Sequence, residues 1–316
     1  MKGMEISRRY FEEYGKNLVQ GEFKEYMAAG LAGEGSECFG YDDDISSDHD
    51  FGPGFIIWLP DDIYRREGEK LQAMYDMLPR SYMGYERIKS VYGGGRVGVM
   101  SIEDFYMKFT GIRKAPEDNI EWFKIPETFL ATATNGQVFI DNLGLFSEIR
   151  AKLKGFYPED VVKKKLAAKC ALMAQSGQYN YPRSLKRGDM QAAYFACCEF
   201  VKNALSAIFI LNSTYMPYYK WAFKKAEELI CLKEDVTILK QITQMGEGEN
   251  KAHLIEEISL HIGAELNKRA MTRTGDSFLQ SHGEELMRSV NDARLKGLHA
   301  ELYPVQQSRR RSRRPG

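Results

Sequence analysis

Residues 35–52 read GSECFGYDDDISSDHDFG, and this stretch is the most informative part of the chain. Its first two residues are Gly35 and Ser36, and near its end stand two aspartates, Asp48 and Asp50, ahead of an apolar run. If a strand begins at Asp48, both carboxylates point to the same face of it. Neighbouring carboxylates repel each other unless a cation lies between them, and Mg²⁺ prefers oxygen ligands. The stretch therefore predicts a metal site, with the Gly-Ser pair offering backbone N–H groups to a phosphate.

Together these motifs resemble the signature of the nucleotidyltransferase superfamily typified by DNA polymerase beta, to which the kanamycin, streptomycin and lincosamide nucleotidyltransferases belong. The chain is also similar to one bacterial branch of that superfamily. Four sequence segments carry this similarity: GEGSECFGYDD, ISSDHDFGPGF, NGQVFIDNLGLFSEIR and YMPYYKW. The resemblance covers roughly residues 20 to 225. It implies a Mg²⁺-dependent enzyme that moves a nucleoside monophosphate from a nucleoside triphosphate to an acceptor hydroxyl and releases pyrophosphate.

The resemblance also assigns roles to individual residues. Asp48 and Asp50 would hold the metal and act in catalysis, and Gly35 and Ser36 would bind the triphosphate. A third carboxylate normally completes such a site on a neighbouring strand, but residues 96–100 carry none. The third ligand therefore stays open. Glu86, Glu103 and Asp104 lie near that segment in the sequence, and Asp141 follows another expected strand.

The second half of the chain adds further candidates. Arg183 and Arg187 could bind a triphosphate, because guanidinium groups match phosphate oxygens. Asp189 could serve as the catalytic base or simply cap the following helix. Lys220 and Trp221 lie in a run of aromatic residues around a proline, where they could contact a phosphate and a base or pack within a turn between helices.

Charge and composition favour an ordinary intracellular protein. Lys+Arg and Asp+Glu both number 44 in 316 residues, so no overall field steers the chain toward nucleic acid or membrane. The charged N-terminus lacks the apolar core of a signal peptide. We expect no bilayer-spanning segment, because the best apolar run, residues 204–211, is short. These features predict a cytoplasmic location, no membrane partner, and an oligomeric state that the sequence leaves open.

Hydrophobic periodicity predicts an α+β chain. Strands are expected at 27–33, 48–59 and 96–100, and helices at 5–20 and 61–77. Asn135-Gly136 between two apolar runs predicts a β-hairpin. From residue 159 helical periodicity dominates, over 159–175, 189–212, 218–231, 250–270 and 277–298. We therefore expect a catalytic domain over 1–155, a helical substrate-binding domain over 156–305, and a disordered basic tail over 306–316.

Two other function classes fit the same motifs. The chain could be a non-catalytic nucleotide-sensing or partner-binding module that lacks the third acid. It could instead transfer nucleotides to a protein or a tRNA, although the balanced charge argues against a nucleic-acid acceptor because phosphate contacts dominate such binding.

Overall fold

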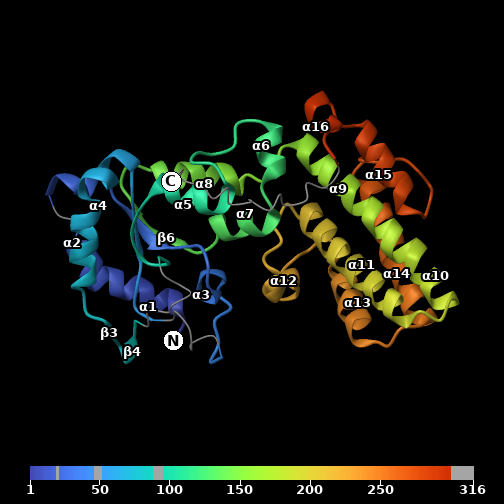
Figure 1. Ribbon diagram of the computed structural model, residues 1–316, viewed down its shortest axis with the longest axis horizontal. Helices are drawn as coiled ribbons and strands as arrows, with labels where there is room; N and C mark the ends of the chain where they lie inside the picture. The colour runs from blue at the N-terminus through green and yellow to red at the C-terminus, as the bar shows by residue number, and fades with distance from the viewer. Residues whose placement is uncertain (19–20, 46–51, 88–94, 300–316) are drawn as a thin grey trace, which may run out of the picture. The chain divides into compact units, whose positions relative to one another are not determined.

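A four-stranded mixed sheet forms the centre of the first part of the chain in the computed structural model, which describes residues 1–18, 21–45, 52–87 and 95–299 (Figure 1). The strand order is β5-β2-β1-β6. β1 pairs antiparallel with β2 and β6, whereas β2 pairs parallel with β5. The four strands are β1 (Ala28–Leu31), β2 (Ile56–Leu59), β5 (Gly98–Ser101) and β6 (Gln137–Asp141).

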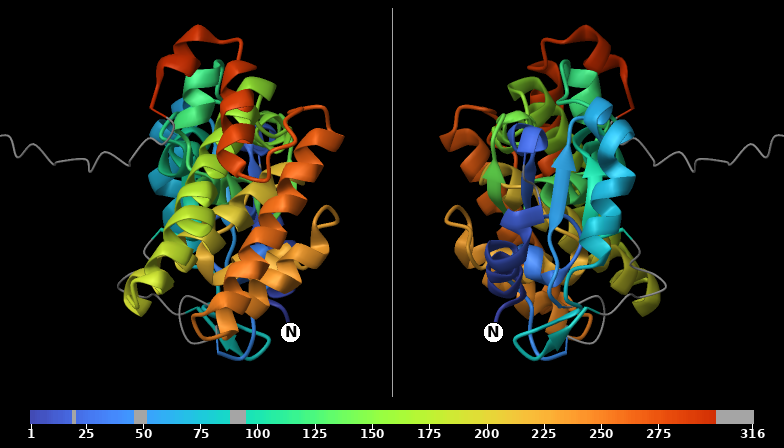
Figure 2. Two further views of the ribbon diagram at one scale, coloured as in Figure 1. Left: turned by 90° about the vertical axis from the view of Figure 1, so that its right-hand side faces the viewer. Right: turned by 90° about the vertical axis from the view of Figure 1, so that its left-hand side faces the viewer.

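Alternating side chains give this sheet two buried faces. Ala29, Ile57 and Val99 face a cluster that includes Tyr10 and Tyr75 from the flanking helices. On the opposite face the Trp58 indole stacks on Phe146 with ring centroids 3.9 Å apart. The alternation follows from the two-residue period of a strand. Figure 2 shows α4 (Asp61–Asp76) beside the sheet, where it contacts β5 and β2.

The helices that pack on the strands of the sheet are α1 (Gly3–Tyr10), α4 (Asp61–Asp76), α5 (Ile102–Thr110) and α8 (Leu145–Lys154). The same part of the chain also contains α2 (Lys16–Leu18), α3 (Ser36–Phe39), α6 (Asn119–Lys124) and α7 (Glu127–Thr134). A π-helical turn, Phe11–Gly15, joins α1 to α2, and a 3₁₀ turn spans Gly21–Tyr26. A separate two-stranded hairpin consists of β3 (Ser81–Tyr82) and β4 (Tyr85–Glu86).

The chain divides into two compact units. The first comprises Met1–Pro158 together with Ile208–Gln241, and so includes α12 (Tyr219–Ala226). The second begins with Glu159–Ala207 and resumes at Ile242. It contains α9 (Glu159–Met173), α10 (Tyr181–Lys186), α14 (Glu249–Lys268), α15 (Leu279–Arg288) and α16 (Ala293–Gly297), with a π-helical segment at Ala174–Asn180. The unit boundaries fall inside α11 (Met190–Leu211) and α13 (Lys233–Gln244).

The α+β class predicted from the sequence is confirmed, with a small mixed sheet followed by a helical region. The assignment of residues 1–155 to catalysis and 156–305 to substrate binding stays a prediction. The structure groups the segment 208–241 with the sheet and not with the later helices. The predicted tail at 306–316 lies outside the described residues.

Several predicted elements need correction. The hairpin at Asn135-Gly136 is wrong, because the residues before it form the helix α7 and only those after it form a strand. Thr132 and Thr134 donate their hydroxyls to carbonyls one turn back, which reconciles β-branched residues with a helix. The predicted helix at 277–298 breaks between α15 and α16. In the described part of the predicted strand 48–59, pairing begins at Ile56.

One helix differs from the expectation about membranes. α11 is long and apolar enough to cross a bilayer by length and composition, and 67% of its most apolar window is buried inside the protein. Most of this apolar surface therefore packs against the chain itself, as in the central helix of a folded core.

Candidate functional site

The Gly-Ser turn lies between β1 and α3. Gly35 adopts φ 120° and ψ 146°, and Ser36 begins the helix α3. A Cβ atom on Gly35 would lie 1.9 Å from Nη2 of Arg96, so the backbone conformation and the close guanidinium both require glycine. Ser36 is 9% exposed, and its hydroxyl makes no hydrogen bond to the residues that the structure describes. The turn thus leaves a polar group available at the start of α3.

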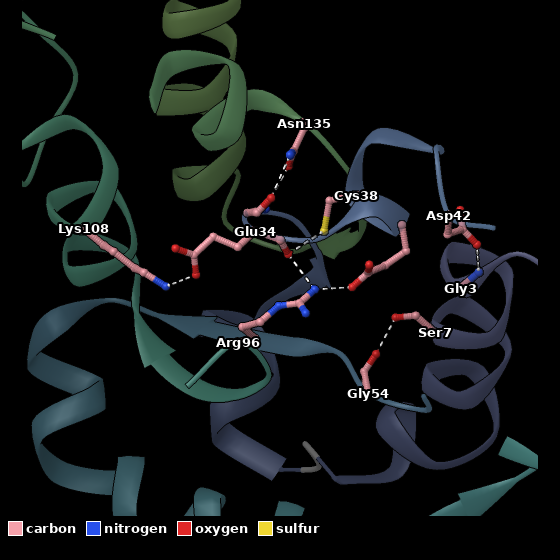
Figure 3. Close-up of polar contacts among 11 residues, drawn as sticks. Gly3, Ser7, Glu34, Cys38, Asp42, Gly54, Arg96, Lys108 and Asn135 are labelled. Carbon is pink, nitrogen blue, oxygen red and sulfur yellow. Dashed lines mark hydrogen bonds and ion pairs between the residues drawn. The ribbon is translucent and has the colours of Figure 1, made fainter. Parts of the chain in front are cut away.

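Ionic contacts hold this turn from one side (Figure 3). Arg96 Nη2 donates to the carbonyl oxygen of Glu34 at 2.7 Å and also pairs with the Glu37 carboxylate. Lys108 Nζ lies 2.7 Å from the Glu34 carboxylate. Burial raises the pKa of Glu37, and the nearby Arg96 opposes that rise. Sequence reasoning missed Arg96 and Glu37; the only signal was the position of Glu37 directly after the Gly-Ser pair.

Asn135 holds the turn from the other side (Figure 3). Its Oδ1 accepts from the backbone N–H of Gly33 at 2.8 Å, and its Nδ2 donates to the Gly33 carbonyl at 2.7 Å. The backbone N–H of Gly136 then donates to the Cys38 carbonyl at 2.8 Å. The Asn-Gly pair therefore connects α7 and β6 while fixing the approach to the Gly-Ser turn.

Asp48 and Asp50 lie outside the described residues. The structure does describe the chain on both sides of them. Gly30 of β1 pairs antiparallel with Ile56 of β2, so the chain enters β2 at the same end of the sheet at which it leaves β1 toward Ser36. Ser7 fixes the entry, because its Oγ donates to the Gly54 carbonyl at 2.5 Å.

The strand beside β2 supplies no third carboxylate. The strand β5, parallel to β2, carries Gly98, Val99, Met100 and Ser101. Asp141 is already used, because its two oxygens accept from the backbone N–H groups of Gly144 and Ser147 at 3.0 and 2.7 Å. Asp42, next to the predicted site, accepts from the Gly3 N–H at 2.8 Å and so orders the start of α1. Within the described ranges, no three His, Cys, Asp or Glu side chains gather as metal ligands.

Lys220 and Trp221, which the sequence predicts as nucleotide contacts, lie in the same unit as Ser36. Trp221, in α12, packs on Tyr41 with ring centroids 5.5 Å apart, and Tyr41 is the second residue after α3. Lys220 is exposed, with its Nζ 4.8 Å from the centre of the Trp221 ring. Tyr41 is fixed in turn, because its hydroxyl donates to Glu228 at 2.6 Å. The aromatic run of α12 therefore packs on the segment that follows the Gly-Ser turn.

The other three candidates belong to the second unit. Asp189 precedes α11, and its Oδ1 accepts from the Ala192 N–H at 2.9 Å, which is the contact of a helix cap. Arg183 is exposed, with its guanidinium 4.7 Å from the centre of the Tyr179 ring. Arg187 is exposed at the end of α10. Their predicted roles stay predictions, because they lie in a different unit from Ser36 and Trp221.

Comparison with known proteins gives limited matches. A family model described as a domain of unknown function, DUF4037, matches residues 122–222. No curated protein matches the chain. The chain is similar to the crystal structure of a nucleotidyltransferase-like protein from Exiguobacterium sibiricum, at 10% sequence identity and a TM-score of 0.36. That match covers 90% of this chain and 78% of the other.

Proposed function

We propose that the chain is a Mg²⁺-dependent nucleotidyltransferase that transfers a nucleoside monophosphate to an acceptor hydroxyl and releases pyrophosphate. The observation that carries the proposal is the Gly35-Ser36 turn. Contacts from Arg96 and Asn135 hold this turn in place, while the Ser36 hydroxyl makes no hydrogen bond within the described residues. A rigid turn with an available hydroxyl suits an oxyanion ligand, because little order remains to be imposed on binding.

The antiparallel pairing of β1 with β2 supports a common site for the two sequence motifs. Ser36 follows β1, and the chain enters β2 at the same end of the sheet, six residues after Asp50 in the sequence. Two carboxylates are a donor set that fits Mg²⁺, which keeps several waters and is usually held by one or two carboxylates and substrate phosphates. When bound, the ion would neutralise charge on the phosphates.

Each candidate residue would then have a separate role in binding the metal ion or the nucleotide. Asp48 and Asp50 would hold the ion, while Gly35 and Ser36 would donate to the triphosphate. Lys220 and Trp221 lie in the same unit as the turn and could bind a phosphate and a base. Asp189, Arg183 and Arg187 remain candidates for the base and for phosphate contacts. The site is expected to act in the cytoplasm on an acceptor that is still to be identified.

A direct experiment tests this function. The protein is incubated with α-labelled nucleoside triphosphates, Mg²⁺ and a cell extract, and the labelled product is identified. A labelled small molecule supports the proposal, whereas a labelled protein or tRNA would make the chain a macromolecule-modifying nucleotidyltransferase. Absence of any labelled product and of pyrophosphate release would contradict it.

The strand β5 favours one alternative. Its four residues carry no carboxylate, so the third acid of an active nucleotidyltransferase is missing from the strand beside β2. A nucleotide-sensing module would keep the turn and lose the third acid. Saturable nucleotide binding without pyrophosphate release would support this alternative.

Replacing Ser36 by alanine tests the turn directly. We expect Ser36→Ala to weaken triphosphate binding by about ten- to a hundredfold, because a hydrogen bond to a charged group contributes roughly 1.5–3 kcal/mol. The melting temperature should hardly change, since the hydroxyl has no partner among the described residues. Isothermal titration with Mg²⁺ present measures the affinity, and Ser81→Ala, in the exposed hairpin, serves as the control. An unchanged dissociation constant would remove Ser36 from the phosphate site.

A further inference from the structure

A pocket of about 340 Å³ lies in the first unit, next to the C-terminal end of α3. Its lining residues come from five segments: the end of α3, the end of α7 with the turn to β6, the end of α8, the segment that follows α11, and α12. This volume lies within the range of small-molecule pockets, which run from about 300 to 1,000 Å³. Neither Ser36 nor Trp221 lines it, so the pocket is distinct from the proposed nucleotide contacts.

Internal hydrogen bonds hold the walls of this pocket in place. Arg150 Nη2 donates to the Thr134, Asn135 and Gly136 carbonyl oxygens at 2.8, 2.5 and 2.9 Å. The Tyr215 hydroxyl donates to the Leu153 carbonyl at 2.7 Å, which ties the turn after α11 to the end of α8. A pocket with fixed walls loses little conformational entropy when a ligand binds.

The lining is positively charged. Lys154 and Lys225 line the pocket, and the described lining includes no carboxylate. Lys225 pairs with Glu228 at 2.7 Å, whereas Lys154 has no hydrogen bond or ion pair to the described residues. Lys154 is exposed, and Arg150 lies one helical turn before it; partial desolvation and then this second cation lower the pKa of Lys154. An anion in the pocket would relieve that repulsion.

Ser213 adds a hydroxyl group to the lining. It adopts φ 49°, the left-handed conformation in which glycine is favoured, at the end of α11. The backbone N–H groups of Ser213 and Thr214 donate to the carbonyls of Ile210 and Phe209, which forms a Schellman ending. Ser213 lines the pocket, and its hydroxyl makes no hydrogen bond in the part of the chain that is described. The helix ending thus fixes Ser213 at the pocket, where its hydroxyl is available to donate to a ligand.

We propose that this pocket binds a small organic anion, with its carboxylate or phosphate group paired to Lys154 and hydrogen-bonded by Ser213. The pocket admits a molecule of a few carbon atoms around that anionic group. The inference does not depend on the proposed transfer activity, because the residues involved lie outside the nucleotide contacts.

The test uses the full-length protein in EDTA at constant ionic strength, so that metal-dependent nucleotide binding is absent. Glycerol 3-phosphate and malate are titrated separately, and binding is followed by calorimetry. We expect saturable binding of at least one probe. Lys154→Gln should weaken it about ten- to a hundredfold, because one charge-assisted hydrogen bond is lost.

Three further variants separate this pocket from other effects. Lys152→Gln, exposed on the same helix, and Ser36→Ala should bind the probe as the parent protein does. Ser213→Gly should keep or raise the melting temperature, since glycine tolerates this backbone conformation, and weaken binding by about two- to tenfold through loss of a neutral hydrogen bond. Preference for one probe identifies the phosphate or the carboxylate as the anion. Absence of saturable binding to the parent, or parent-like affinity in Lys154→Gln, would overturn the proposal.

Discussion

Asp48→Asn and Asp50→Asn are each expected to abolish metal-dependent nucleotide transfer while the protein stays folded. Each change removes one charged ligand from a pair that would hold Mg²⁺. A metal ion contributes several kcal/mol of transition-state stabilisation, so the rate should fall by about a thousandfold or more. Pyrophosphate release, measured with saturating nucleoside triphosphate and Mg²⁺, gives the size of the loss.

The apo protein should not lose stability in these variants. Two neighbouring carboxylates repel each other without metal, so removing one charge should leave the melting temperature unchanged or raise it. Mg²⁺ should raise the melting temperature of the parent protein through binding to the native state, and this shift should disappear in both variants. Asp44→Asn, an exposed acid four positions before Asp48 in the sequence, is the matched control. Parent-like turnover in Asp48→Asn and Asp50→Asn would refute the metal assignment.

Local patterns in the sequence predicted much of the first unit. The apolar run at Phe55–Leu59 indicated β2, and the acids after Pro60 indicated the start of α4. The β-hairpin predicted at Asn135-Gly136 was wrong, because the preference of this dipeptide for hairpin turns reflects only its immediate neighbours in the sequence. The preceding residues form a helix whose end is fixed by contacts from Gly33 and Arg150, far away in sequence. Tertiary contacts therefore overrode a turn preference.

In the candidate site, too, the sequence reveals local motifs but not contacts between residues that are distant in the sequence. Gly35 and Ser36 could be chosen from the sequence because a short motif carries them. Arg96 could not, since nothing in its own neighbourhood indicates that it contacts the Glu34 carbonyl and the Glu37 carboxylate. The grouping of Trp221 with Tyr41 also depends on the return of residues 208–241 to the first unit, which periodicity alone does not reveal.

Arg150→Met is expected to destabilise the first unit by on the order of 3–5 kcal/mol. Arg150 is 7% exposed, and its guanidinium is the shared donor to three consecutive carbonyl oxygens at the end of α7. Methionine keeps much of the apolar volume but leaves the three carbonyls without this donor. Leaving a buried acceptor unsatisfied costs about 1–3 kcal/mol, and such costs add less than fully within one network.

The loss should spread to the Gly-Ser turn. Asn135, whose carbonyl accepts from Arg150, also bonds both backbone groups of Gly33 through its side chain. Loosening the Asn135-Gly136 segment therefore removes one of the two restraints on the turn and weakens nucleotide binding as well. Urea unfolding measures the free energy of unfolding, and calorimetric titration with Mg²⁺-nucleotide at a temperature where the variant is folded measures the affinity.

Two companion variants separate the possible causes. Arg150→Lys keeps the charge, but its side chain is shorter and its ammonium reaches the three carbonyls less well, so its stability should lie between those of the parent and Arg150→Met. Lys152→Met, on the exposed side of the same helix, should stay within about 0.5 kcal/mol of the parent. If Arg150→Met unfolds at the parent's urea concentration, water must replace the guanidinium at all three carbonyls. The rigidity of the Gly-Ser turn would then rest on Arg96 and the Asn135 side chain alone.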